Sequence, residues 1–209
     1  MNSDSVPGLV DTLEQLETLF GEVGQASIQK EQSFIHPHYR AMIEASPFAV
    51  LATVGPGGLD VSPRGDAAGF VVVEDERTLL LPERRGNNRV DSLRNLIADP
   101  RMALLFLIPG VGETLRVNGT ARISVAPDLL RRFEVDGKAP KCVLVIRVET
   151  AFFQCARAIH RSRLWQGVPD AARAGIPSPG TMLADFSHAE IDDEQYDREL
   201  PERQRTTLY

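Results

Sequence analysis

The chain has 209 residues, of which 43% are hydrophobic and 25% charged, a balance that suits one globular domain with a substantial core. Its 23 basic and 29 acidic residues give a net charge of −6, which argues against nonspecific nucleic-acid binding, because phosphate affinity needs a positive face. Two cysteines are too few for a disulfide framework, the start MNSDSVPGLV does not resemble a secretory leader, and no apolar run is long enough for a membrane span. We therefore expect a cytoplasmic protein.

Two helices are predicted before the first strand. Residues 10–21 (VDTLEQLETLFG) place apolar side chains at helical spacing with acids between them. Residues 36–46 (HPHYRAMIEAS) predict a second helix that ends at Ser46, because the residue before Pro47 avoids the helical region. We expect residues 1–46 to form an N-terminal helical arm.

From residue 48 onward the pattern is that of strands joined by short turns. Residues 48–54 and 59–65 flank the turn GPGG and predict a first hairpin. Residues 69–74 and 78–83 flank a second turn and predict a second hairpin.

One internal helix follows the second hairpin. Asn87 or Asn88 can cap it, and Asp99–Pro100 ends it. Its apolar stripe is predicted to consist of Val90, Leu93, Leu96 and Ile97.

The rest of the chain predicts further strands. Residues 101–108 suit a fully buried strand, residues 113–125 a long strand with an irregularity at Asn118–Gly119, and residues 127–135 a short helix. Residues 141–149 and 151–157 are expected to close the sheet. Antiparallel strands with short helices between them predict a mainly β barrel or sandwich with helical decoration. We expect this domain to cover residues 47–168, followed by a largely extended C-terminal extension, residues 169–209, with one helix across 191–200.

The densest polar cluster combines SPRGD (62–66) with PERRGNNRVDSLRN (82–95). If the two hairpins are neighbours, their arginines and the unpaired amides of the following helix start would offer a phosphate monoester several donors. The alternative is a solvated turn whose arginines stay in water. There is no Walker-type loop and no G-x-G-x-x-G, so neither a nucleoside triphosphate site nor a Rossmann dinucleotide site is supported.

Three segments carry a family resemblance: VLATVGPGGLDVSPRGDAAGFV, TLLLPERRGNNRVDSLRNLIADPRMALLFLIPGVGETLRVNGTARI and AFFQCARAIHRSRLW. In this order they resemble the pyridoxamine 5′-phosphate oxidase-related, FMN-binding split-barrel family, in particular its flavin-nucleotide-binding branch. The resemblance covers residues 40–168. It implies a split β-barrel of antiparallel strands and a homodimer, with two FMN molecules in clefts between the subunits.

The resemblance also implies which residues contact the flavin. Ser62 and Arg64 lie on the strand that faces the flavin in this family, and Leu81 and Pro82 line the ring edge through backbone groups. The resemblance implies that Asn88, Arg89, Ser92 and Asn95, at the start of the helix, hold the phosphate. It implies that Arg116, on the long strand, approaches the flavin. It also implies that Arg161, Ser162 and Trp165, near the end of the fold, contact the cofactor. Trp165 is either a stacking surface or an anchor in the core or interface.

An FMN-dependent oxidoreductase acting on an unidentified small molecule is the first functional hypothesis. The alternatives are a non-catalytic flavin carrier, store or sensor, and a split barrel that holds haem or a deazaflavin. No catalytic side chain is assigned, because flavin N5 can take a hydride directly. The true oxidase ends in an Arg-Leu-x-Pro-type segment, whereas this chain ends ERQRTTLY, so we do not expect oxidation of pyridoxamine phosphate.

Histidines and cysteines offer weaker candidates. His36 and His38 lack a third ligand of suitable spacing, so no metal site is predicted. His160 could contact a substrate or a haem, and Cys155 is expected to pack in the sheet.

Overall fold

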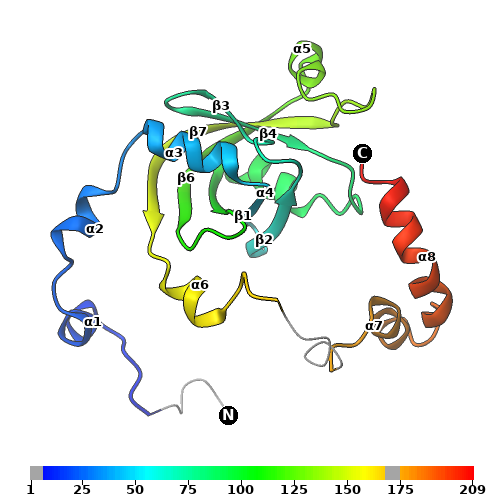
Figure 1. The fold of residues 1–209 in the computed structure, drawn as a ribbon. Helices are drawn as coiled ribbons and strands as arrows, with labels where there is room; N and C mark the ends of the chain where they lie inside the picture. Colours follow the sequence, from blue (N-terminus) through cyan, green and yellow to red (C-terminus); the bar gives the residue numbers. More distant parts are fainter. Residues whose placement is uncertain (1–6, 168–174) are drawn as a thin grey trace. The chain divides into compact units, whose positions relative to one another are not determined.

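The computed structural model describes residues 7–167 and 175–209. The chain divides into two compact units, Met1–Glu31 and Gln32–Tyr209 (Figure 1). In the first unit, α1 (Leu13–Phe20) starts with a capping box in which Thr12 and Gln15 exchange side-chain and backbone hydrogen bonds. A short α2 (Gln25–Gln29) follows. Neither helix buries a residue within this unit, so the apolar face of α1 is exposed there.

The second unit is built on one antiparallel sheet. The strand order is β2-β1-β5-β6-β7-β4-β3, and β2 and β3 are the two outer strands. Consecutive strands form the hairpins β1–β2 and β3–β4, whose register is unbroken in β1–β2 and shifted once in β3–β4. The strands are β1 (Phe48–Gly55), β2 (Gly58–Gly65), β3 (Val72–Asp75), β4 (Thr78–Glu83), β5 (Arg101–Leu107), β6 (Thr114–Ser124) and β7 (Cys142–Gln154).

The sheet curls around the long β6–β7 ladder without closing. β5 pairs with residues 115–120 of β6, whereas β4 pairs with residues 142–147 of β7, which lie toward the opposite end of that ladder. The ladder itself shifts register between Asn118 and Gly119. A Cβ atom at Gly119 would collide with the carbonyl oxygen of Arg147, so this bulge requires glycine. Two hairpins therefore flank an open split in the barrel.

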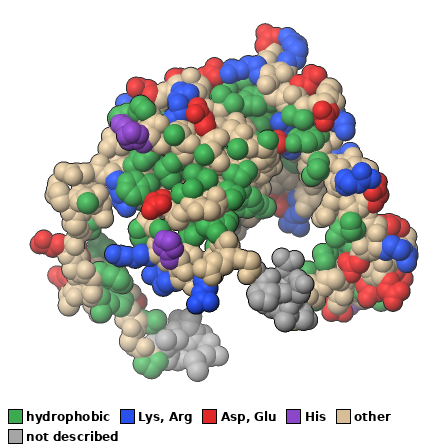
Figure 2. Space-filling view, in the orientation of Figure 1, with side chains coloured by type: hydrophobic (Ala, Val, Ile, Leu, Met, Phe, Trp, Pro, Cys, Tyr) green, Lys and Arg blue, Asp and Glu red, His purple; other side chains and the backbone are tan. Residues whose placement is uncertain are grey.

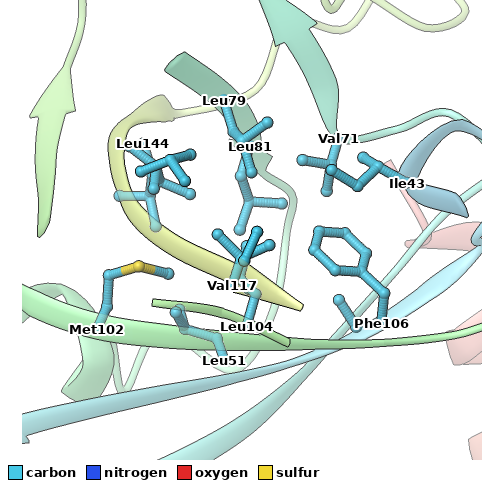
Figure 3. Packing of buried hydrophobic residues seen from close by; sticks show 14 of the residues in the cluster. Ile43, Leu51, Val71, Leu79, Leu81, Met102, Leu104, Phe106, Val117 and Leu144 are labelled. Atoms are coloured by element: carbon cyan, nitrogen blue, oxygen red, sulfur yellow. The ribbon is translucent and has the colours of Figure 1, made fainter. Parts of the chain in front are cut away.

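One hydrophobic core fills the curled sheet. Six of the seven strands, together with α3 (Pro37–Ala45) and α4 (Asp91–Ala98), contribute buried side chains to a single cluster (Figure 3). Ile43, Leu51 and Leu144 are fully buried although they come from distant parts of the chain. Because one face of nearly every strand points into the same core, the sheet is a split barrel and not two packed layers.

Short helices cover the openings of the barrel. α3 packs against β3, β6 and β7, and α4 packs against β1, β2 and β6. α5 (Pro127–Arg131) covers a small second cluster formed by Leu80, Phe133 and Val143 on the other face of β4 and β7. α6 (Arg157–Ser162) follows β7.

A helical hairpin forms the C-terminal part of the described chain. α7 (Pro179–Phe186) begins at Ser178, whose hydroxyl accepts a hydrogen bond from the Thr181 amide. α8 (Asp193–Thr206) packs against α7 and continues through Pro201. Asp197 joins the two helices by accepting hydrogen bonds from the Gly180 amide, at 2.8 Å, and from Ser178. Within residues 7–167 and 175–209, no helix has the length and apolar character needed to cross a bilayer.

The predicted fold, a mainly β split barrel of antiparallel strands with helical decoration, is confirmed. Several local expectations were wrong. Residues 141–157 form one long strand and a helix start where two strands were expected, and β5 buries only alternate residues because its other face lies on the outside of the barrel. α7 lies in a tail that was expected to be extended, and Ile97 is exposed, so it does not belong to the apolar stripe of α4.

Candidate functional site

A hollow of about 550 Å³ lies in the split between β2, β4 and the start of α4. We call it the split hollow. Five basic and three acidic side chains line it, together with apolar side chains from both hairpins. Its lining consists of residues 60–65, Phe70, residues 82–93, Lys141 and Cys142.

Two ion pairs connect the hairpins across the split. The Arg64 Nε atom of β2 lies 2.8 Å from Glu83 Oε1 of β4, and Arg84 Nε lies 2.8 Å from Asp66 Oδ2. All four side chains are at most 17% exposed. The two hairpins are thus brought together as the sequence suggested, but by side chains, because β2 and β4 lie far apart in the strand order.

A chain of hydrogen bonds continues from Arg64 to the start of α4. Arg64 Nη1 donates to Ser62 Oγ at 2.9 Å, and the hydroxyls of Ser62 and Ser92 are 2.8 Å apart. Ser92, which is buried, also donates to Asp60 Oδ2 at 3.0 Å. This network holds β2 against α4 and fixes one wall of the split hollow.

The loop before α4 has an unusual backbone. Asn88 and Val90 both have positive φ angles, 61° and 51°, and for the β-branched valine this is a strained conformation. Val90 occupies the N-cap position without any side-chain cap, so the prediction that Asn87 or Asn88 caps the helix was wrong. Asn87 instead accepts a hydrogen bond from the Arg89 amide. The amides of the first turn of α4 are therefore left without a capping side chain, at the edge of the hollow.

The donor set of the split hollow fits a phosphate group. In the part of the chain that is described, neither Arg85 nor Lys141 has a carboxylate within ion-pair distance, although both line the hollow. Among the residues that the structure describes, Arg89 forms an ion pair only with its near neighbour Asp91, at 2.8 Å, and its side chain is 75% exposed. Guanidinium groups, an ammonium group and uncapped helix amides are the groups that bind phosphate oxygens.

The hollow also has apolar walls of the kind that a planar ring needs. Val61, Pro63, Phe70, Pro82 and Leu93 line it between the charged groups. The combination of a phosphate-binding corner and apolar walls fits a phosphorylated, ring-containing cofactor better than it fits a simple inorganic ion.

Cys142 lines the hollow and is nearly fully buried. Burial raises the pKa of its thiol above the ordinary value; Glu83 raises this pKa further, and Arg64 lowers it. The thiol is therefore protonated at neutral pH, which makes it a lining group and not a nucleophile.

The residues implied by the resemblance fall into two groups. The split hollow brings together Ser62, Arg64, Pro82, Asn88, Arg89 and Ser92.

The second group lies outside the hollow. Leu81 is fully buried in the barrel core, and the Asn95 amide donates to Thr53 Oγ1 on β1, at 3.1 Å. Arg116 lies over the Phe152 ring at 4.0 Å, and its buried Nε has no hydrogen-bond partner among the described residues. Trp165 donates from Nε1 to the Val111 carbonyl at 2.6 Å.

The other two candidates of this group belong to α6. Ser162 donates to the Ile159 carbonyl one turn earlier in the helix, at 3.1 Å. Arg161 is exposed on the same helix.

Sequence reasoning missed several lining residues. Asp60 and Glu83 hold Ser92 and Arg64, and Lys141 adds a positive charge from the loop before β7. Asp60 and Glu83 alternate along β2 and β4 with residues that were predicted to contact the flavin, so the sequence pattern could have identified these two acids. For Lys141 there was none, because its position depends on β7 pairing with β4.

His36 takes a structural position. His36 Nδ1 accepts a hydrogen bond from the His38 amide and so caps α3. Across residues 7–167 and 175–209, no group of three or more His, Cys, Asp or Glu side chains is arranged to hold a metal ion.

The fold class is thus an antiparallel split barrel with a hollow beside the start of α4. Residues 35–155 match the profile of the family described as pyridoxamine 5′-phosphate oxidase, and the chain belongs to this family. No curated protein matches the chain in sequence.

Three solved structures are similar to part of the chain at 20% sequence identity or less. HupZ of Group A Streptococcus is 20% identical, with a TM-score of 0.48, over 58% of this chain and 94% of that one. General stress protein 26 of Bacillus anthracis is 17% identical, with a TM-score of 0.41, over 54% of this chain and 88% of that one. A Clostridium acetobutylicum protein related to general stress protein 26 is 15% identical, with a TM-score of 0.44, over 56% of this chain and 86% of that one.

Proposed function

We propose that this protein binds FMN in the split hollow and acts as a flavin-dependent oxidoreductase on a small molecule. The observation that carries the proposal is the corner where Arg85, Arg89 and Lys141 meet the uncapped start of α4. Membership of the pyridoxamine 5′-phosphate oxidase family supports FMN as the ligand of that corner.

The residues of the hollow have separate tasks in this proposal. Arg85, Asn88, Arg89 and Lys141, with the first amides of α4, hold the phosphate, and the Ser62–Ser92 pair keeps β2 and α4 at a fixed separation. The apolar walls exclude water from the ring. When bound, FMN supplies the two-electron chemistry, and the chain contributes binding, orientation and electrostatics.

The outer face of the barrel supports a homodimer. Register places Val50, Leu105, Arg116 and Phe152 in one row across β1, β5, β6 and β7, on the face opposite the core. The members of this row are half-buried, and hydrophobic side chains gather over β1 and β6 on the face seen in Figure 2. A second copy that covered this face would bury the row.

Both cysteines are unpaired, which suits the reducing conditions of the cytoplasm, where we place the homodimer.

The site can be tested by titrating the protein with FMN and measuring how far the flavin fluorescence is quenched. Arg89→Ala should weaken FMN binding by about tenfold or more, because a charge-assisted contact to the phosphate is lost. Arg122→Ala removes the same charge from an exposed position on β6 outside the hollow and should leave the affinity unchanged. Equal affinities in wild type and Arg89→Ala would remove this corner from the site.

The redox part of the proposal needs a separate experiment. The FMN-loaded protein should lose its yellow colour with NADPH or another reduced donor and regain it in air. A protein that binds FMN tightly but is reduced by no physiological donor would be a flavin carrier or sensor instead.

A further inference from the structure

The C-terminal hairpin, which consists of α7, α8 and the residues between them, is strongly acidic. Residues 175–209 carry eight acidic and three basic side chains. Acidic side chains gather over α8 on the face seen in Figure 2. Asp185, Glu190 and Glu194 are exposed, and none of them has a basic side chain within ion-pair distance among the residues that the structure describes. The hairpin therefore presents negative charge that its own chain does not neutralise.

The same hairpin has an exposed apolar stripe. Met182 and Phe186 lie about one turn apart on the same face of α7. Phe186 is 76% exposed and Met182 is 36% exposed. Exposed apolar side chains that lie side by side and are bordered by charge are typical of an interaction surface. A partner for this hairpin should therefore offer apolar side chains and positive charge together.

The α6 patch, which we define as Arg157, Arg161, Arg163, Leu164 and Trp165, offers both. Its three arginines are exposed, and no acidic residue lies between them in the sequence. Within the described ranges, none of these arginines has a carboxylate within ion-pair distance. Leu164 is 47% exposed and Trp165 is 37% exposed. The patch is thus complementary to the hairpin in both charge and apolar character.

The α6 patch adjoins the face through which we expect the homodimer to form. β7 carries Phe152, a member of the row of half-buried outer-face residues, and ends at Gln154. α6 begins three residues later, at Arg157. A second copy that covers the row is therefore brought close to the α6 patch.

The hairpin is fixed to its own barrel at Tyr209. The hydroxyl of Tyr209 donates to Asp66 Oδ1 at 2.6 Å, and Lys138 Nζ donates to the main-chain oxygen of Tyr209 at 3.2 Å. In the part of the chain that is described, α7 and α8 pack against each other, and no ion pair joins them to α6. The apolar stripe and the free carboxylates of the hairpin are therefore available to a second copy.

We propose that the C-terminal hairpin of each subunit docks on the α6 patch of the other subunit. The apolar stripe covers the apolar end of the patch, and the carboxylates neutralise its arginines. The two contacts are equivalent, because a twofold axis relates the subunits. This inference rests on the homodimer of the proposed function, and it names the segments that the two subunits exchange.

Reversing the charge on one side at a time tests the contact. The patch variant, Arg157→Glu with Arg163→Glu, makes the α6 patch acidic. The hairpin variant, Glu190→Arg with Glu194→Arg, makes the hairpin basic. All four positions are exposed and lie outside the split hollow. We expect each variant to weaken the homodimer by roughly five- to thirtyfold in analytical ultracentrifugation at low salt, because exposed attractive pairs become repulsive.

Matched controls carry the same changes in charge at exposed positions away from α6. Arg77→Glu with Arg131→Glu matches the patch variant, and Glu76→Arg with Glu134→Arg matches the hairpin variant. Both controls should dissociate as the wild type does.

Mixing the patch variant with the hairpin variant distinguishes exchange between subunits from a contact within one chain. In a mixed dimer, the basic hairpin meets the acidic patch and the acidic hairpin meets the basic patch. Mixed dimers should therefore dominate in native mass spectrometry and be about as stable as the wild-type homodimer. A contact within one chain would stay repulsive in both variants, and mixing would not repair it.

The apolar part of the contact has its own variant. Phe186→Ser should weaken the homodimer by about tenfold or more, because a large side chain loses its cover in both contacts. Val125→Ser, at a position that is 67% exposed before α5, is the control and should leave the homodimer unchanged. A homodimer of Phe186→Ser as stable as that of the control would overturn the inference.

The other outcomes are equally decisive. Mixed dimers at no more than their statistical share would overturn the exchange, as would charge variants that dissociate as their controls do. Weakening by the patch variant but not by the hairpin variant would mean that another acidic segment, such as α1, covers the α6 patch. A wild type that stays monomeric would refute the homodimer of the proposed function and this inference with it, whereas a stable homodimer that none of these variants weakens refutes the inference alone.

Discussion

Replacing Arg64 by methionine should destabilise the protein, because Arg64 pairs with Glu83 across the split of the barrel. The two side chains are only 17% and 13% exposed, with 2.8 Å between Nε and Oε1. At an effective dielectric constant of about 20 and roughly 4 Å between the centres of the two delocalised charges, their attraction is about 4 kcal/mol, and desolvation offsets most of it. We therefore expect a coupling energy of about 1–2 kcal/mol. Arg64→Met alone should cost about 2–3 kcal/mol, since Ser62 and the Pro63 carbonyl also lose a donor.

Urea unfolding of a double-mutant cycle measures this coupling. The cycle compares wild type, Arg64→Met, Glu83→Gln and the double variant, and the m-values should stay equal. The exposed pair of Arg132 and Glu74 on the same unit is a matched control and should couple less strongly. A coupling no larger than that of the control would refute the conclusion that this ion pair holds the two hairpins together.

Three further predictions follow from single contacts. Gly119→Ala should cost about 3 kcal/mol or more in thermal or urea unfolding, because the added Cβ meets backbone of β7 that cannot move aside; a loss below 1 kcal/mol would argue against the bulge. The pKa of the Cys142 thiol should rise further in Arg64→Met, since Arg64 lowers it in the wild type; the midpoint of alkylation by iodoacetamide against pH, in a variant without the other cysteine, should move upward. Tyr209→Phe should cost about 0.5–1 kcal/mol at neutral pH. Burial raises the pKa of Asp66, but the hydrogen bonds that Asp66 accepts, above all the one from Tyr209, lower this pKa overall. The loss of stability in Tyr209→Phe is therefore present above the ordinary carboxyl pKa, and it disappears as the pH falls through the lowered pKa of Asp66.

Hairpins were the most predictable part of the fold. Residues 78–83 were predicted and observed as β4 with the same bounds, and β1 and β2 differ from their predictions by one residue each. Runs of apolar and β-branched residues on either side of a short turn determine such units locally. The irregularity at Asn118–Gly119 was also visible, because a glycine within a strand pattern signals a bulge.

Long-range geometry was not predictable from local pattern. The prediction placed the arginines of the two hairpins together by assuming that the hairpins were neighbours, whereas the strand order separates β2 from β4 and ion pairs bridge them. The cap of α4 was predicted two or three residues too early, since capping preference favours asparagine, but the loop backbone places Val90 at that position. Lys138 and Tyr209, 71 residues apart, meet only through tertiary packing.

Arg116 provides a test of whether the site is shared between subunits. Arg116 lies on the outer face of the barrel, away from the split hollow to which Arg89 belongs, so a single chain does not bring the two together. In a shared site, Arg116→Ala and Arg89→Ala would each weaken FMN binding as homodimers. Mixing the two variants so that subunits exchange should then restore about a quarter of the sites, because half of the dimers are mixed and each mixed dimer has one intact site. No recovery, despite mixed dimers shown by native mass spectrometry, would mean that one subunit supplies every FMN contact or that Arg116 has no part in the site.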